Sequence, residues 1–238
     1  MKICICIPCV DKHIVLLENL LGSFDKFSKQ PDEIMVSLSP KFHNFDLNKK
    51  KEELLEKFSN KNLKILVQNK KTNAATHLNI MSEKVESDII MRADADDTMH
   101  PRKVEIVYKI FTQYPDTKLL LHRWLTTTPH RDYELSCYPE VNVDNIEIFD
   151  DVEIAPKSEV MSLKFSKKFN ADEYRLGRSN IIHNGANTFA KEAIKQVKFR
   201  NRNFAEDKLF NYDVTHHFNK TIYIHLPLVV YSPSGSWR

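Results

Sequence analysis

The first half of the chain alternates short apolar runs with longer amphipathic stretches, and this alternation restricts the folds open to it. Apolar runs of strand length are expected at Lys2–Pro8, Glu33–Leu38, Leu63–Gln68, Asp88–Arg92 and Lys118–Trp124. Apolar residues at helical spacing predict helices between them, at His13–Phe27, Asp46–Phe58, Thr72–Val85 and Pro101–Tyr114. Such alternation is typical of an α/β fold with a mostly parallel, Rossmann-like sheet flanked by helices.

The second half is less regular. Residues 126–182 contain three prolines and an acidic run, and they exceed the length of an ordinary connection, so we expect functional loops with short elements there. Helices are predicted at Ala186–Val197 and Ala205–His216, and a strand at Thr221–His225. Because no internal repeat or linker interrupts the sequence, we expect a single domain over residues 1–238.

The ends of the predicted strands indicate where a ligand would bind. In parallel sheets, ligands lie beyond the carboxyl ends of the strands. These ends are Pro8–Asp11, Ser37–Pro40, Gln68–Asn73 and Asp94–Asp97. The four segments should therefore converge on one crevice.

One of these ends carries a cluster of acids. Asp94, Asp96 and Asp97 directly follow the apolar run Ile89–Met91. Clustered carboxylates repel one another, and a hard divalent cation such as Mg²⁺ or Mn²⁺ would relieve the repulsion and share its coordination with phosphate. The alternative is a polar loop in which Asp97 or Thr98 caps a helix that begins near Pro101.

Composition excludes several classes of function. The net charge of +3 does not predict nucleic-acid binding, and with four glycines the chain contains neither G-x-G-x-x-G nor G-x-x-x-x-G-K-[ST]. No apolar run approaches the ~18–20 residues that span a bilayer, and the N-terminus lacks a signal-peptide pattern. Cytoplasmic residence is therefore expected.

The cysteines near the N-terminus have two interpretations. Cys4, Cys6 and Cys9, with His13 nearby, resemble a zinc spacing. However, Cys4 and Cys6 alternate with isoleucines as in a buried strand, and an extended backbone directs Cys9 to the opposite face. Structural thiols are the preferred interpretation.

Several segments match, in order, the pattern of a known family. Asn79 lies fifteen positions before Asp94, although Leu78 replaces the arginine usual before it. The other matching segments are Asp94-Ala95-Asp96-Asp97 with Pro101, Arg102 and Glu105, Asn180–His183 with Thr188–Lys191, Ala205-Glu206-Asp207, and Leu226–Tyr231. In this order the chain resembles an inverting family 2 glycosyltransferase of the GT-A fold, a class that uses nucleotide-diphosphate sugars.

The resemblance implies roles for the acids. Asp96 would bind Mn²⁺ or Mg²⁺ directly, Asp94 would contact the ribose or hold the ion through water, and Asp97 would be a ligand or a supporting partner. Asp207 would be the general base, with Glu206 as its orienting neighbour or as the alternative base. Otherwise, Glu206 and Asp207 are first-turn acids favoured by the helix dipole.

The resemblance also implies two functional halves. Residues 1–115 would bind the nucleotide sugar, with UDP-sugar as first choice. Residues 116–238 would bind a glycan or glycolipid acceptor. The resemblance is also compatible with peripheral membrane contact. The predicted donor-binding residues are Pro8, Cys9, Asp11, Ser39, Lys71, Asn73, Asn79, Asp94, Ala95, Arg200 and Arg202. Arg238 is a further candidate for the diphosphate, and Trp237 for stacking on a sugar.

Two other functions compete with glycosyl transfer. A sugar nucleotidyltransferase is also α/β with metal-binding carboxylates, but it usually has a Gly-rich basic loop after its first strand, which this sequence lacks. A non-catalytic nucleotide- or carbohydrate-binding module of the same fold is the second alternative.

Overall fold

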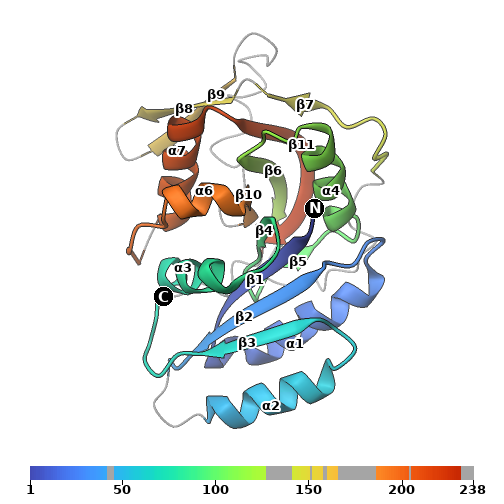
Figure 1. Cartoon of the computed structure of the whole chain (residues 1–238), viewed down its shortest axis with the longest axis vertical. Coiled ribbons are helices and arrows are strands. Elements are labelled where there is room, and N and C mark those ends of the chain that lie inside the picture. Colours follow the sequence, from blue (N-terminus) through green and yellow to red (C-terminus); the bar gives the residue numbers. More distant parts are fainter. Residues whose placement is uncertain are drawn as a thin grey trace.

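A single curled sheet forms the centre of the protein (Figure 1). The computed structural model describes residues 1–41, 46–126, 141–150, 152–157, 160–165, 186–203 and 205–231. The strands are β1 (Ile3–Val10), β2 (Glu33–Ser39), β3 (Leu63–Val67), β4 (Ile89–Arg92), β5 (Thr98–Met99), β6 (Leu119–Thr126), β7 (Ile148–Phe149), β8 (Val152–Lys157), β9 (Val160–Phe165), β10 (Thr188–Ala190) and β11 (Thr221–Tyr231). The helices are α1 (Ile14–Ser23), α2 (Leu47–Lys57), α3 (Ala74–Lys84), α4 (Lys103–Gln113), α6 (Lys191–Gln196) and α7 (Glu206–Phe218).

The main sheet is parallel in one part and mixed in the other. Its order is β3-β2-β1-β4-β10-β6-β11-β5, and β7 also pairs with β11. From β3 to β4 all neighbours are parallel, as the sequence predicts. β10 is antiparallel to both β4 and β6, while β6 and β11 are parallel. The carboxyl ends of β1, β2, β4, β6 and β11 therefore share one edge.

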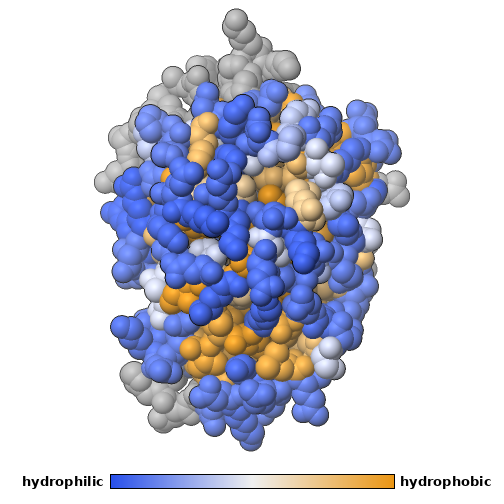
Figure 2. Space-filling model, in the orientation of Figure 1, coloured by the Kyte–Doolittle hydropathy of each residue, from blue (hydrophilic) through white to orange (hydrophobic). Residues whose placement is uncertain are grey.

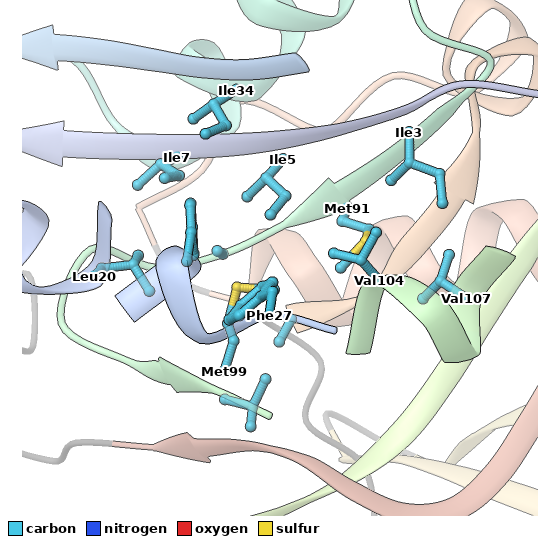
Figure 3. Close-up of a cluster of buried hydrophobic side chains, with 14 of the residues drawn as sticks. Ile3, Ile5, Ile7, Leu20, Phe27, Ile34, Met91, Met99, Val104 and Val107 are labelled. Carbon is cyan, nitrogen blue, oxygen red and sulfur yellow. The ribbon is translucent and has the colours of Figure 1, made fainter. Parts of the chain in front are cut away.

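Helices cover both faces of the sheet, and β1 is therefore buried on both sides. Ile3, Ile5 and Ile7 pack in a core with residues of α1 and α4 (Figure 3), and α2 contributes to the same core. Cys4 and Cys6 point the other way, into a core shared with α3, α6 and α7. Burying one large aliphatic side chain contributes roughly 1.5–3 kcal/mol, so this two-sided core fixes the position of β1.

The face of the protein seen in Figure 2 is mostly polar. An apolar area lies over β2 and β3 in its lower half. β3 is an end strand of the sheet, and four of its five residues are half-buried.

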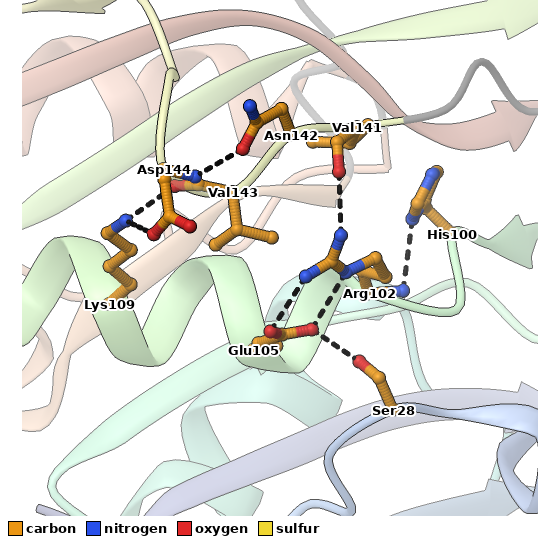
Figure 4. Close-up of polar contacts among 9 residues, drawn as sticks. All are labelled: Ser28, His100, Arg102, Glu105, Lys109, Val141, Asn142, Val143 and Asp144. Carbon is orange, nitrogen blue, oxygen red and sulfur yellow. Dashed lines mark hydrogen bonds and ion pairs between the residues drawn. The ribbon is translucent and has the colours of Figure 1, made fainter.

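The segment that follows residue 140 is held by α4 (Figure 4). Arg102 Nη1 donates to the Val141 carbonyl and Lys109 Nζ to the Val143 carbonyl, both at 2.7 Å. Val141 and Val143 are buried in the same core as Ile5. Part of the region predicted as loops is thus anchored by side chains of a helix.

Two local expectations were wrong. Thr188–Ala190 is a strand rather than the start of a helix, because it fills the gap between β4 and β6, and α6 follows it. Asp97 does not cap α4, since the N-cap position is Arg102, whose backbone N–H donates to His100 Nδ1 at 3.0 Å. By contrast, the antiparallel strands β8 and β9 agree with the short elements expected between residues 126 and 182.

Candidate active site

The predicted strand ends meet on one edge of the sheet. Val10 is in register with Ser39, and the Ala93 N–H, just past β4, donates to the Cys6 carbonyl at 3.0 Å. The acidic loop turns immediately afterwards, because the Asp97 N–H donates to the Asp94 carbonyl at 3.1 Å. The loop therefore starts beside Cys6 of β1. The end of β1 leads into the buried Asp11.

Arg92, the last residue of β4, joins this loop to the start of α7. Its Nη2 donates to Asp94 Oδ1 and to Glu206 Oε1, both at 3.2 Å. The side chain of Arg92 is 3% exposed. The two acidic motifs, which are far apart in the sequence, thus contact the same buried guanidinium.

The electrostatics show that the carboxylates share one neighbourhood. Burial raises the pKa of Asp94, Arg92 opposes this rise, and the charges of Asp96 and Asp207 add to it. Burial also raises the pKa of Glu206, again opposed by Arg92 and increased by Asp207 and Asp94. The donor-side acids and the predicted base therefore act on one another electrostatically at one edge of the sheet.

The residues present fit a hard divalent cation in chemistry but supply few ligands. Asp96 is half-buried, and burial raises its pKa while Lys12 and Arg92 lower it. Within the described residues, no group of three or more His, Cys, Asp or Glu side chains is close enough to hold a metal. Carboxylate oxygens of Asp94 and Asp96 suit Mn²⁺ or Mg²⁺, and phosphate and water oxygens would have to complete the shell.

The end of β1 brings buried groups near the same acids. Burial raises the pKa of the Cys9 thiol, and the charges of Asp96 and Asp11 raise it further. Cys9 therefore lies near both acids, while Cys4 and Cys6 face the opposite core with their Sγ atoms 3.8 Å apart. The split of the cysteines between two faces confirms the structural interpretation of the thiols.

Ser39 belongs to a buried polar network that the sequence analysis missed. Ring nitrogens of His77 lie 2.7 Å from Ser37 Oγ and 3.0 Å from Ser39 Oγ, and Gln68 Nε2 donates to Ser37 Oγ at 3.2 Å. His77 is fully buried, and burial lowers its pKa to about 4. Its position on the apolar face of the predicted helix, one residue before Leu78, was the available signal.

Two asparagines predicted to bind the donor are engaged with the segment before α7. Asn79 Nδ2 donates to the Phe199 carbonyl at 2.9 Å, and its Oδ1 accepts the Phe199 N–H at 3.0 Å. Asn73 caps α3 through its Oδ1 and donates to Asn201 Oδ1 at 2.6 Å. Both side chains hold α3 to residues 199–203, and donor contact stays a prediction for each.

The predicted basic residues lie on the surface. Arg200 forms a two-point ion pair with Asp213 at 2.8 and 2.6 Å. Arg202 and Lys71 are exposed. Pro8 and Ala95 are buried beside the crevice and offer it little beyond backbone. Asn180–His183, Trp237 and Arg238 lie outside the described residues.

A second residue missed by the sequence analysis lies behind the acidic loop. Lys103, in the first turn of α4, is fully buried, and its Nζ donates to the Ala186 carbonyl at 3.1 Å. Burial lowers its pKa to about 7, while Asp97 and Asp94 act in the opposite direction. Lys103 thus places a basic group behind the candidate metal ligands.

Comparison with known proteins tests the resemblance. The family model described as "Glycosyl transferase family 2" matches residues 44–149, which include the acidic loop and end before Glu206. No curated protein matches the sequence.

Several solved structures share the fold. TarS 1–349 of S. aureus is 15% identical with a TM-score of 0.65, over 98% of this chain and 60% of that one. The same protein in complex with UDP-GlcNAc is 16% identical with a TM-score of 0.64, over 98% and 58%. The mannosyltransferase PcManGT from Pyrobaculum calidifontis, in complex with GDP-Man and Mn²⁺, is 14% identical with a TM-score of 0.62, over 100% and 58%.

The family model covers less than half of the chain, and the solved structures share its fold. The family-model match and the shared fold confirm the predicted resemblance to family 2 glycosyltransferases of the GT-A fold. This chain spans about 60% of the length of TarS 1–349. In the described part of the chain, no helix is both long enough and apolar enough to cross a membrane.

Proposed function

We propose that the protein transfers a sugar from a nucleoside-diphosphate donor to an acceptor hydroxyl, with inversion at the anomeric carbon. The observation that carries the proposal is the convergence of two acidic motifs on one buried arginine at the carboxyl edge of the sheet. Neighbours of the same fold in complex with UDP-GlcNAc and with GDP-Man and Mn²⁺ support a donor of this class. UDP-sugar remains the first choice.

Asp94 and Asp96 would hold the divalent cation. When bound, Mn²⁺ or Mg²⁺ supplies positive charge that offsets the charge of the leaving diphosphate. Asp96 takes the direct position and Asp94 the supporting one, because one Asp94 oxygen already accepts from Arg92. Cys9 and Asp11 would lie on the donor side of the same sheet edge, Cys9 from within the core.

Asp207 is the proposed general base. It stands in the first turn of α7, is half-buried, and its charge acts on both Arg92 and Asp94. A carboxylate there takes the proton of the acceptor hydroxyl. The hydroxyl oxygen attacks the anomeric carbon at the same time, and the bond from that carbon to the diphosphate breaks. Glu206 is the less suitable base, because its carboxylate already accepts from buried Arg92.

The products of a donor assay test the proposal. Incubation with UDP-sugars or GDP-sugars and Mn²⁺ should release free nucleoside diphosphate, faster with an acceptor glycan present. Release of pyrophosphate from a nucleoside triphosphate and a sugar phosphate would instead indicate a nucleotidyltransferase. Binding without turnover of any donor would indicate a non-catalytic module.

A matched pair of variants tests the base. Asp207→Asn should lower donor turnover at least about 100-fold, the usual contribution of general-base catalysis, while nucleotide binding persists. Asp116→Asn, the same change at an exposed residue between α4 and β6, is the control. Normal turnover by Asp207→Asn would remove Asp207 from the mechanism. Cytoplasmic residence and peripheral membrane contact belong to the proposal and are tested by cell fractionation.

A further inference from the structure

Arg92 takes no part in the proposed chemical step, although it lies between the two acidic motifs. It ends β4, its backbone N–H donates to the Asn187 carbonyl at 3.0 Å, and its side chain is 3% exposed. The partners of its guanidinium, Asp94 and Glu206, come from two different segments, 2 and 114 residues away in sequence.

The burial of this charge makes its partners important. An arginine removed from water is tolerated only when carboxylates compensate its charge, and removing the compensation is strongly destabilising. Both bonds run from the single atom Nη2, while Nε and Nη1 are buried without a hydrogen-bond partner among the described residues. The pairing with Asp94 and Glu206 is therefore the principal compensation that the described structure offers.

The first turn of α7 has no side-chain N-cap, so the contact of Glu206 with Arg92 supports it where a cap is missing. Ala205, at the N-cap position, has a φ of 58°, and its side chain makes no capping hydrogen bond. A non-glycine residue in this left-handed region is strained and persists only where its surroundings hold it. The next residue along, Glu206, is the one that Arg92 holds.

We propose that Arg92 is a positioning residue that fixes the first turn of α7 against the acidic loop. By holding Glu206 and Asp94 on one atom, it determines where Asp207 stands relative to Asp94 and Asp96. Its effect on catalysis rests on the proposed function, whereas the mechanical link between β4 and α7 does not.

A sign reversal in thermal stability tests the link without any activity assay. With Arg92 present, Asp94→Asn and Glu206→Gln should each lower the melting midpoint. The double variant should lose more than the sum of both, because the buried charge then has neither carboxylate. In an Arg92→Met background the same substitutions should raise the midpoint, because they remove buried carboxylates that have lost their partner. Additive losses in both backgrounds would overturn the proposal.

Kinetics separate positioning from a merely structural role. Arg92→Met should lower kcat at least tenfold with less than a threefold change in donor KM, and Arg92→Lys should recover part of the loss because it returns a cation to the same place. Arg102→Met removes an arginine paired with Glu105 on α4 and should leave kcat unchanged. An unaltered kcat in folded Arg92→Met would overturn the catalytic consequence.

The outcomes distinguish the two proposals. If the wild type turns over no donor yet shows the sign reversal, the proposed function fails and the link stands. If Arg92→Met does not fold, the double-mutant cycle of Asp94→Asn and Glu206→Gln still tests the link. It is then measured in the wild type and in the Arg92→Lys background. Coupling present in the first and weakened in the second supports the link, and equal additivity in both overturns it.

Discussion

The side chain of Asn79 bonds twice to the backbone of Phe199, 120 residues later in the sequence. Asn79→Ala removes two hydrogen bonds of about 1 kcal/mol each and leaves the N–H and carbonyl of Phe199 without these partners. The substitution should therefore destabilise the protein by about 2–3 kcal/mol. Chemical denaturation measures this loss. The control is Asn203→Ala, because Asn203 is exposed and its contact with Asn73 among the described residues is a long one. Nucleotide titration of the folded Asn79→Ala variant separates the two roles: wild-type affinity would leave Asn79 a structural residue, and weakened binding would support the predicted donor contact.

Phe210 is the centre of an aromatic cluster that fixes α7. Its ring stacks on Phe199 with centroids 3.9 Å apart and meets Phe189 edge-on at 4.8 Å. Phe210→Ala should lower the free energy of unfolding by about 3–5 kcal/mol, because it leaves a cavity among buried rings. Urea denaturation should show a smaller loss for Phe210→Leu, which fills much of the volume. A loss for Phe210→Ala no greater than that for half-buried Phe218→Ala would contradict the cluster's role.

The first half of the fold could be predicted because its signals are local. Strand β1 alternates isoleucines and cysteines toward two covered faces, and Asp94–Asp97 follow a strand that the pattern predicts within a residue. The convergence of strand ends then follows from the parallel sheet alone.

The second half could not be predicted because non-local pairing decides it. Thr188–Ala190 becomes a strand only because β4 and β6, distant in sequence, leave a gap of its width. The contact of Arg92 with Glu206 likewise depends on tertiary structure. No periodicity in residues 186–197 indicates either feature, whereas the buried His77 was within reach of the helical pattern.

Burial of His77 should make stability depend on pH in the acidic range. Its pKa is lowered from 6.5 to about 4, so between these values the unfolded chain binds a proton that the folded chain does not. The folded state should therefore lose up to about 3 kcal/mol as the pH falls from 6.5 to 4, with no contribution above 6.5. Denaturation at a series of pH values measures the slope.

The His77→Gln variant isolates this contribution. Glutamine does not titrate, so the variant should be less stable at pH 7 yet show a flatter decline between pH 6.5 and 4. The exposed His216→Gln substitution is the control and should leave the slope unchanged. Equal slopes for the wild type and His77→Gln would assign the acid sensitivity to other groups.

Asp213 occupies the guanidinium of Arg200, which the sequence analysis predicts to contact the donor diphosphate. If Arg200 serves the donor, Asp213 competes with it, so Asp213→Asn should tighten nucleotide-diphosphate binding several-fold, and the gain should shrink with added salt. Because Arg200 is 53% exposed, stability should change by no more than about 1 kcal/mol. Isothermal titration at two salt concentrations measures the affinity. Arg200→Ala added to Asp213→Asn should cancel the gain, and an unchanged affinity in Asp213→Asn alone would leave Arg200 as a surface ion pair that holds residue 200 to α7.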